Sequence, residues 1–335
     1  MDMWHMGHEK DTKIRRDSMK RVLIVAVVLF AVIGGAVFGG GQGEDGDQLH
    51  IGVATANFDD KWMSYMHEGF EEAGKELGVR VTMVDGKNDA SIQQGQIDTF
   101  ITQGVDAIVI VPVDAGSIGP ILDETESAGI PLIAVNRKPS EENIKRLATY
   151  VGSDEVYAGT VQAEAVAEIL GGEGNVVIMN GEIGHSGMIG RTQGNKDVLA
   201  QNPGMELVAE DTAEWSRALG LNLMENWIQT GMEIDAVLAN NDEMAIGAIM
   251  ALEQVNMLDE VVVAGVDATP DALQFMEEGK LNVSVFQNAY GQGYGGMEAA
   301  VKAAQGEDLP EITDIPFEPV LPEDVDKYKA MWGIE

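Results

Sequence analysis

The side chains that could bind a ligand lie just after the short apolar segments of the sequence, where each apolar run gives way to polar residues. They are Asp60, Trp62, Asn136, Arg137, His185, Arg191, Trp215, Asn241, Asp267 and Gln287. Carboxylates and amides can pair with neighbouring hydroxyl groups, arginine offers a fixed fork of donors, and an indole can cover the C–H face of a saturated ring. The set therefore predicts a site for a polyhydroxylated ring, although two arginines beside two aspartates could also accept a zwitterion.

Nine short apolar segments are predicted to be strands, and the amphipathic stretches between them are predicted to be helices. The strands are expected at 50–55, 79–84, 107–111, 132–135, 175–179, 206–210, 236–239, 261–265 and 283–286. Steps of three and four residues, as in Met66, Phe70 and Ala73, place apolar side chains on one helix face. Repeated strand–helix units favour parallel strands with helices on both faces of a sheet. We therefore expect an α/β fold with two doubly wound parallel-sheet lobes, in which ligands bind beyond the carboxyl ends of the strands.

The composition excludes several classes of protein. The chain has 21 basic and 56 acidic residues, a net charge of −35, which would repel the phosphate backbone of a nucleic acid. It has no cysteine, so disulfides, thiol catalysis, cysteine-ligated metals and an acylated cysteine are excluded. The acidic balance indicates either ordinary solvated helix faces or adaptation to a saline medium that screens self-repulsion.

The first 41 residues are predicted to be an export signal or an N-terminal anchor. Basic residues precede an unbroken apolar run at 22–38, which ends in glycines 39–41 where a signal peptidase could cut. The run is slightly shorter than the ~20 residues of a full membrane span. Met19 could also be the true start, because Met19, Lys20 and Arg21 open a short signal by themselves. Residues 42–48 are expected to form a polar linker, and the protein is expected in the periplasm or another extracytoplasmic space.

Five separated motifs carry a resemblance to a known family. They are Asn-Phe-Asp-Asp-Lys-Trp-Met at 57–63, Val-Asn-Arg-Lys-Pro at 135–139, Tyr-Val-Gly-Ser-Asp at 150–154, Asn-Asn-Asp-Glu-Met-Ala-Ile-Gly at 240–247 and Gly-Val-Asp-Ala-Thr-Pro at 265–270. With these motifs in this order, the chain resembles the type I periplasmic sugar-binding proteins over residues 49–318. Further segments, at 184–187, 191–194, 212–217, 224–227 and 285–288, are most similar to the myo-inositol or rhizopine branch of that family.

The resemblance implies a monomeric solute-binding protein, not an enzyme, of an importer of the ATP-binding-cassette (ABC) class. It implies two lobes that close on one cyclic polyol, with myo-inositol as the first candidate, and a membrane permease as partner. The first lobe would comprise 49–153 and 288–317, and the second 154–287 and 318–335. A three-segment hinge would cross near Ser153, Asn288 and Phe317. No cofactor or metal is implied, since 171–175 lacks the alternating oxygen ligands of the family's calcium loop.

The resemblance also implies roles for the candidate residues. Asp60 would bind ring hydroxyls and Trp62 would stack on one face of the ring, with Asn136 and Arg137 from the same lobe. The second lobe would supply His185, Arg191, Asn241, Asp267 and Gln287, and Trp215 would stack on the opposite face. Phe58 could line the cleft or plug the hinge. Gly187 stands where the galactose-type pattern has an acidic residue, which makes glucose or galactose a weaker candidate.

Other interpretations compete with these. Asp60, Asn136 and Asp267 could simply cap helices, the tryptophans could belong to the core, and the arginines could form surface ion pairs. The glycine-rich segment 291–296 fits the G-x-G-x-x-G spacing of a dinucleotide loop, but it does not follow a strand directly. A lactose-repressor-type regulator would need a basic helix-turn-helix head, which an export signal cannot supply. Ribose- or galactose-type binding, and a sensor that presents a sugar to a chemoreceptor or sensor kinase, stay open.

Overall fold

The computed structural model describes residues 48–334. The predicted export signal and residues 42–47 of the predicted linker lie outside the described residues. Among the helices of the described part, none is long and apolar enough to span a membrane. The structure therefore does not bear on the signal or anchor predicted at the N-terminus.

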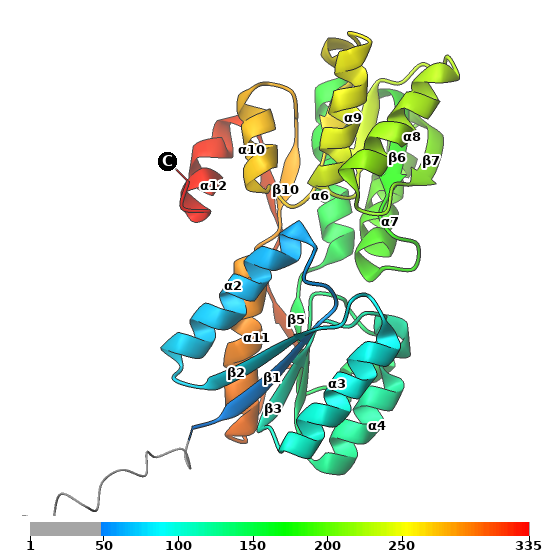
Figure 1. Cartoon of the computed structure of the whole chain (residues 1–335). Coiled ribbons are helices and arrows are strands. Elements are labelled where there is room, and N and C mark those ends of the chain that lie inside the picture. Colours follow the sequence, from blue (N-terminus) through cyan, green and yellow to red (C-terminus); the bar gives the residue numbers. More distant parts are fainter. Residues whose placement is uncertain (1–47, 335) are drawn as a thin grey trace, which may run out of the picture. The chain divides into compact units, whose positions relative to one another are not determined.

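A six-stranded sheet, in which all neighbouring strands are parallel, begins at His50 (Figure 1). Its order is β11-β5-β4-β3-β1-β2, with β1 (His50–Thr55), β2 (Arg80–Asp85), β3 (Ala107–Ile110), β4 (Leu132–Val135), β5 (Thr149–Gly152) and β11 (Ile312–Asp314). The strands β1, β3, β4 and β5 are buried along their whole length, as expected for parallel strands covered on both faces. Their carboxyl ends lie along one edge of the sheet.

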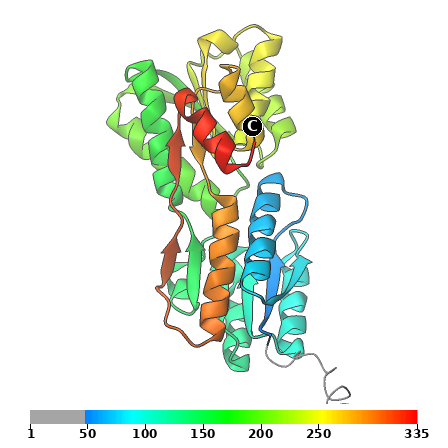
Figure 2. The same ribbon diagram turned by 90° about the vertical axis from the view of Figure 1, so that its left-hand side faces the viewer.

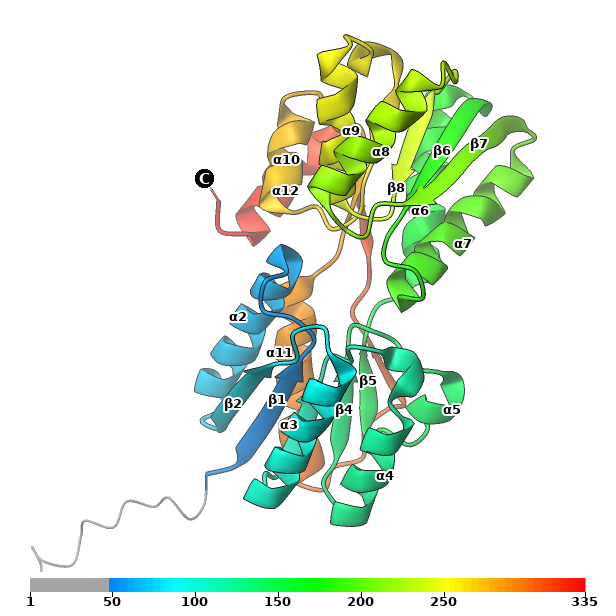
Figure 3. The ribbon, with the colours of Figure 1, turned by 45° about the vertical axis from the view of Figure 1, so that its right-hand side comes forward.

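Helices cover both faces of this sheet (Figure 3). One face packs on α2 (Lys61–Glu76) and α11 (Ala289–Ala304), and the other on α3 (Ala90–Gln103) and α4 (Gly119–Ala128). The short η1 (Ala115–Ser117) and α5 (Glu141–Ile144) lie in the connections between strands. Met66, Phe70 and Ala73 of α2 are fully buried against the sheet, so the helix face predicted from their spacing is confirmed.

The second group of strands forms a four-stranded parallel sheet and an adjoining antiparallel pair. The sheet has the order β7-β6-β8-β9, with β6 (Glu173–Asn180), β7 (Gly204–Thr212), β8 (Ala236–Ala239) and β9 (Val262–Ala264), and the pair is β10 (Ser284–Phe286) with β12 (Glu318–Val320). Isolated parallel bridges, Ala264 to Val283 and Asp267 to Phe286, join β9 and the residues after it to the pair. Asp267 is thereby fixed at the end of the sheet.

Helices also cover both faces of this second group of strands (Figure 3). On one face lie α6 (Glu155–Leu170) and α7 (Ser186–Gln201), and on the other lie α8 (Arg217–Gln229), α9 (Asp242–Gln254), α10 (Pro270–Glu277) and α12 (Val325–Met331). The single turns η2 (Leu258–Glu260) and η3 (Pro322–Asp324) complete the elements. The predicted α/β fold with parallel sheets is confirmed.

All nine predicted strands are present within two residues at either end, and three further strands were missed. The missed strands are β5, β11 and β12, which have only three or four residues and include glycine, aspartate, glutamate or proline. The antiparallel pairing of β12 with β10 was not expected either. Such short segments become strands because a neighbouring edge offers backbone partners, and a proline is tolerated at an edge.

Within the described part, the chain passes between the two groups of strands three times (Figure 2). The passages lie between β5 and α6, between β10 and α11, and between β11 and β12. We call the six-stranded sheet with its helices the first lobe, and the other strands with their helices the second lobe. The residue boundaries given for the lobes above stay a prediction.

The glycine-rich segment 291–296 lies inside α11, so it is not a dinucleotide-binding loop. Its glycines instead allow α2 and α11 to touch. A Cβ atom on Gly293 would overlap the carbonyl oxygen of Met66, and one on Gly69 would overlap the carbonyl oxygen of Tyr290. This close contact fixes α2, whose first turn carries site residues.

Candidate ligand-binding site

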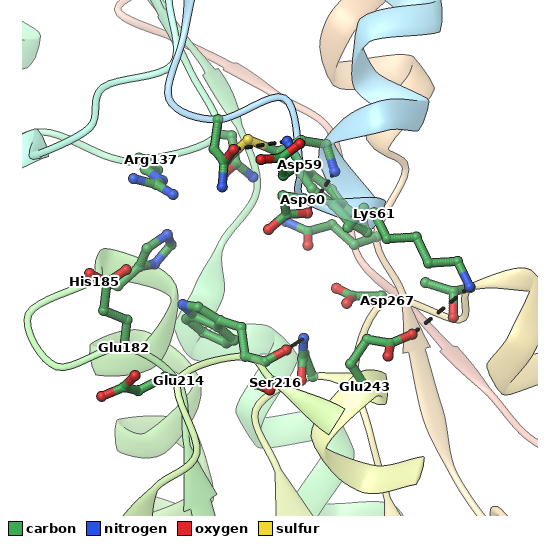
Figure 4. A pocket seen from close by; sticks show the side chains of 18 of the residues that line it. Asp59, Asp60, Lys61, Arg137, Glu182, His185, Glu214, Ser216, Glu243 and Asp267 are labelled. Atoms are coloured by element: carbon green, nitrogen blue, oxygen red, sulfur yellow. Dashed lines mark hydrogen bonds and ion pairs between the residues drawn. The ribbon is translucent and has the colours of Figure 1, made fainter. Parts of the chain in front are cut away.

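A cavity of about 310 Å³ is lined by residues of both lobes (Figure 4). Its lining includes ten of the eleven predicted site residues: Asp60, Trp62, Asn136, Arg137, His185, Arg191, Trp215, Asn241, Asp267 and Gln287. All of them except Arg191, which lies in the second turn of α7, follow the carboxyl end of a strand or lie at the start of the next helix. Small-molecule sites usually have volumes of ~300–1,000 Å³, so this cavity suits a small ligand.

Phe58 is the predicted site residue that does not line the cavity. Its side chain is 43% exposed, and its ring meets His67 edge-on with centroids 5.0 Å apart. Its backbone N–H donates to Asp85 Oδ1 at 3.2 Å. In this structure Phe58 therefore packs on α2 outside the cavity.

A residue that follows a strand can cap the next helix and also contact a ligand. Asp60 caps α2 by accepting a hydrogen bond from the backbone N–H of Met63 at Oδ1, 2.9 Å, which leaves its second oxygen free to accept from a ligand. Asn241 caps α9 by accepting from the N–H of Met244 at 3.0 Å, and its amide donates to the carbonyl of Trp215 at 3.3 Å. One N–H of that amide remains for a further acceptor.

Asp267 carries a buried carboxylate that makes no hydrogen bond to the described residues. Its closest cation is Arg191, with Nη1 3.6 Å from Oδ1, and Figure 4 shows the carboxylate pointing into the cavity. Burial raises the pKa of Asp267 well above its ordinary value, Arg191 acts in the opposite direction, and Asp242 adds to the rise. A buried carboxylate that accepts no hydrogen bond is unfavourable even beside an arginine, so a ligand hydroxyl that donates to it would reduce that cost.

Backbone strain is concentrated around the same cavity. Eight non-glycine residues of the described part have positive φ, and five of them line the cavity: Asn88, Asn136, Glu214, Trp215 and Asp267. Asparagine tolerates the left-handed region, but tryptophan and aspartate at φ of 63° and 122° do not do so readily. Strained residues persist where the surrounding structure holds them, and they gather at ligand sites.

Arg191 is held by hydrogen bonds from all three of its nitrogens. Nε donates to Glu155 Oε2 at 2.7 Å, Nη1 to the carbonyl of Asn240 at 2.7 Å, and Nη2 to Gln287 Oε1 at 2.9 Å. Burial alone would lower the pKa of Arg191, but Glu155 and Asp267 more than offset it and raise the pKa. The guanidinium is therefore charged and fixed in orientation.

Arg137 is the buried arginine of the first lobe. Nη1 donates to the carbonyls of Pro112 and Val113, at 3.2 and 2.8 Å, while Nε is buried without a partner. Burial lowers its pKa from the ordinary value. Neither Arg137 nor Arg191 forms a surface ion pair, so the alternative of surface pairing does not apply to them.

The two tryptophans line the cavity rather than the centres of the cores. The ring of Trp215 meets His185 edge-on at 5.0 Å and lies 5.7 Å from Cζ of Arg191. A Cβ atom on Gly181 would overlap the indole of Trp215, so that position requires glycine. Among the described residues, eight buried polar side-chain atoms lack a partner, and four belong to the cavity lining: Trp62 Nε1, Arg137 Nε, Trp215 Nε1 and Gln287 Nε2. All four are N–H donors.

His185 caps α7 in its neutral form. Its Nδ1 accepts a hydrogen bond from the backbone N–H of Gly187 at 3.0 Å, which places the ring proton on Nε2. Burial, with Arg137 and Arg191 nearby, lowers the pKa of His185 well below its ordinary value. The ring can therefore offer a hydrogen bond to a ligand without adding charge to the site.

We predict that His185→Asn reduces the acid sensitivity of the fold. Because the pKa of His185 is lowered in the folded protein, the unfolded chain binds the extra proton first, and stability is lost as pH falls below about 6.5. Asparagine keeps the cap but does not titrate. The melting temperature of the variant should fall less than that of the parent between pH 7.5 and 5, and equal falls would contradict the prediction.

The structure adds lining residues that the sequence analysis did not select. They are Asn57, Asp59, Lys61, Met63, Asn88, Glu155, Glu182, Glu214, Ser216, Glu243 and Thr269. Glu155 matters most, because it is buried and bonded to Arg191. It opens α6 directly after β5, so the rule that ligand residues follow strands would have found it if β5 had been recognised.

A cluster of exposed and partly exposed charges joins the two lobes at the cavity. Lys61 at the start of α2 lies 2.7 Å from Asp271 and 4.0 Å from Glu243, and Arg217 pairs with both carboxylates at 2.9 and 2.7 Å. Lys61 and Arg217 hold the pKa of Asp271 below its ordinary value. Because the side chains of Lys61 and Asp271 are 43% and 39% exposed, the pair is open to screening by salt.

We predict that Lys61→Gln weakens ligand binding slightly at low salt and not at high salt. An exposed ion pair is worth about 0.2–1 kcal/mol, which corresponds to at most about a fivefold change in affinity. Lys75→Gln is the control, because Lys75 pairs with Glu72 on the same helix at 3.5 Å, away from the cavity. Calorimetric titration at low and at molar salt measures the difference. A change that persists at molar salt would show that Lys61 contacts the ligand instead.

Comparison with known proteins places the chain among solute-binding proteins. Residues 51–308 match the family model described as a periplasmic binding protein domain. A Rhizobium meliloti protein named as a rhizopine-binding protein is 43% identical over 285 residues, which cover 84% of this chain and 92% of that protein. A xylitol-binding protein of Mycolicibacterium smegmatis is 36% identical over 271 residues, which cover 81% of this chain and 76% of that protein.

A solved structure is similar over the same range. It is an ABC transporter solute-binding protein from Bacillus halodurans C-125 with bound myo-inositol. The two chains are 45% identical, with a TM-score of 0.82, and the match covers 86% of this chain and 99% of the other. All the residues that line the cavity fall within 51–308.

Proposed function

The chain belongs to the periplasmic binding protein family, and from this premise we propose that it binds one cyclic polyol in the cavity and delivers it to an ABC importer. Myo-inositol is the first candidate ligand, and the protein works outside the cytoplasmic membrane. It acts as a receptor and catalyses no reaction, in keeping with relatives that are solute-binding proteins.

The observation that carries this proposal is the mixture of unused donors and acceptors in one cavity. Asp60 and Asp267 hold carboxylate oxygens without hydrogen-bond partners, while Arg137 and Gln287 hold buried N–H groups without partners. A hydroxyl group both donates and accepts, so a ring that carries several hydroxyls can satisfy both kinds of group at once. An anionic ligand would be repelled by the carboxylates, and an apolar ligand would leave these polar groups without hydrogen-bond partners.

The choice of a cyclitol over a pentose or hexose rests on similarity. The relative with bound myo-inositol and the relative named for rhizopine are each more than 40% identical to this chain over most of its length. We infer that Asp60, Asn136 and Arg137 bind the ligand from the first lobe. From the second lobe, His185, Arg191, Asn241, Asp267 and Gln287 would bind it, and Trp62 and Trp215 would cover the two faces of the ring.

The proposed mechanism is ligand-driven closure. Because both lobes contribute lining residues, a ligand that contacts both favours the arrangement in which those contacts are made together. The surface formed in that arrangement is what a permease would recognise. Uptake would thus be coupled to occupancy of the cavity.

Calorimetric titration of the full-length chain tests the proposal. Myo-inositol, scyllo-inositol, galactose and ribose are each titrated in a detergent without a sugar headgroup. Saturable one-to-one heat with myo-inositol would support both the receptor role and the ligand. Heat with ribose or galactose alone would keep the receptor and overturn the cyclitol. Absence of heat with all four, in folded protein, would contradict the proposed ligand class.

A further inference from the structure

The three passages between the lobes are tied together by side chains at both of their ends. The ends in the first lobe are Ser153, Gln292 and Ile315, and the ends in the second lobe are Glu155, Gln287 and Phe317. Two separate buried groups of residues hold these ends, one in each lobe, and each includes residues that line the ligand cavity.

The first group is the Gln292 cluster, formed by Gln292, Ser153, Asn136 and the carbonyl of Ile315. Ser153 Oγ donates to the carbonyl of Ile315 and accepts from Gln292 Nε2, the latter at 2.9 Å. Gln292 Oε1 accepts from Asn136 Nδ2 at 3.0 Å. Gln292 is fully buried and Ser153 and Asn136 nearly so. One chain of hydrogen bonds thus joins all three passages to a residue of the cavity.

The second group is the Arg191 cluster, formed by Arg191, Glu155, Gln287 and Phe317. The guanidinium donates to Glu155 two residues beyond Ser153, and to Gln287 one residue before α11 is capped by Asn288. Its Cζ lies 5.5 Å from the ring centroid of Phe317, within cation–π distance. The same guanidinium lies beside Asp267 and Trp215 in the cavity.

We propose that the Gln292 cluster and the Arg191 cluster confine hinge bending to the few residues between them and pass ligand occupancy to the hinge. This inference rests on the proposed receptor function. Each cluster fixes three chain segments relative to one another. It also includes a cavity residue: Arg191 contacts all three of its segments, and Asn136 donates to Gln292. A ligand that engages both residues therefore acts on both ends of every passage.

The physical basis is the cost of breaking a buried polar network. A buried donor or acceptor that loses its partner costs about 1–3 kcal/mol, so each cluster either stays whole or opens at a substantial cost. Rotation between the lobes is then accommodated at residue 154, at residue 288 just before α11 begins, and at residue 316, which lie outside both clusters. Without the clusters, the passages could bend at different places and the lobes would sample more arrangements.

The test uses one variant in each cluster that does not line the cavity. Ser153→Ala removes the hydroxyl that links Ile315 to Gln292, and Phe317→Leu removes the ring beside Arg191 while keeping an apolar side chain. Because the chain has no cysteine, Thr99→Cys on α3 and Asn226→Cys on α8 give unique, exposed positions for a spin-label pair. Pulsed electron spin resonance on the full-length chain reports the distance between the lobes, with and without saturating myo-inositol.

We expect both variants to broaden the distance distribution of the ligand-free protein and to leave it broader than that of the parent at saturating ligand. The matched controls are Ser127→Ala, whose hydroxyl donates to the backbone carbonyl of Asp123 within α4, and Phe275→Leu, whose ring centroid lies 5.5 Å from Lys280 Nζ. Both controls should give the parent distribution. Melting temperatures are measured alongside, because a purely structural role would lower them without broadening the distances.

Distributions in both variants that match the parent would overturn the proposal. The distances measured without ligand separate the proposed hinge role from the proposed receptor function. If the parent binds none of the polyols while the two variants still broaden the ligand-free distribution, the hinge role stands and the receptor assignment fails. If the parent binds myo-inositol and neither variant changes the distribution, the receptor assignment stands and the hinge role fails.

Discussion

Asp267→Asn is expected to remove most ligand binding and, in the same protein, to stabilise the ligand-free fold. Replacing a buried carboxylate that accepts hydrogen bonds from a ligand by a neutral amide costs about 3 kcal/mol of binding free energy. This cost corresponds to a loss of about 100-fold in affinity. Within the described residues the same carboxylate accepts no hydrogen bond, and it pairs with Arg191 at 3.6 Å. The substitution therefore removes an unfavourable charge from the fold and a favourable contact from the complex.

The gain in stability depends on pH in a defined direction. The pKa of Asp267 is raised in the folded protein, chiefly by burial. The folded parent therefore holds a proton that the unfolded chain has released, and the parent loses stability as pH rises above about 4 toward the folded pKa. Asparagine does not titrate. The difference in melting temperature between variant and parent should grow with pH over this range.

Asp242→Asn is the matched control for this prediction. Asp242 is fully buried too, and burial raises its pKa to about 7. However, its two oxygens accept from Ser284 Oγ at 2.7 Å and from the N–H of Thr269 at 2.9 Å. An amide can replace only one of these acceptors, so no comparable gain in stability is expected for Asp242→Asn.

An affinity of Asp267→Asn equal to that of the parent would contradict the prediction and would remove Asp267 from the proposed site.

The strands that could be predicted from the sequence are the ones whose own residues require burial. His50–Thr55 and Ala107–Ile110 are apolar enough to need cover on both faces, and they are strands in the structure. In contrast, β11 reads Ile-Thr-Asp and β12 reads Glu-Pro-Val. Each has a partner only because distant parts of the chain bring an edge beside it. Such strands depend on tertiary structure, which local patterns do not contain.

The site could be predicted to the extent that it depends on strand ends. Asp60, Asn136 and Asp267 follow predicted strands, and all three line the cavity. Glu155 was missed because it follows β5, a strand that was missed. Phe58 was selected because it follows β1, yet its ring turns toward His67 outside the cavity. Position along the chain fixes which edge of a sheet a residue occupies, but not the direction of its side chain.

Gly159→Ala is expected to destabilise the fold and to weaken ligand binding together. A Cβ atom on Gly159 in α6 would overlap the carbonyl oxygen of Arg191 in α7, and one on Gly194 would overlap the carbonyl oxygen of Val156. The two helices therefore meet backbone to backbone. Overpacking of this kind costs about 1–3 kcal/mol, and the better helix propensity of alanine returns only about 1 kcal/mol of it.

The effect on binding follows from the position of Arg191. Because the obstructed atom is its own carbonyl oxygen, the variant must move the backbone that carries the guanidinium held by Glu155 and Gln287. Gly95→Ala is the control, since Gly95 is exposed in α3 with no heavy atom within 4 Å of an added Cβ. That control should gain about 0.5–1 kcal/mol in unfolding free energy and keep its affinity. Calorimetric melting and titration measure both quantities, and a Gly159→Ala protein that melts lower while binding as tightly as the parent would show that the cavity does not depend on how closely α6 and α7 pack.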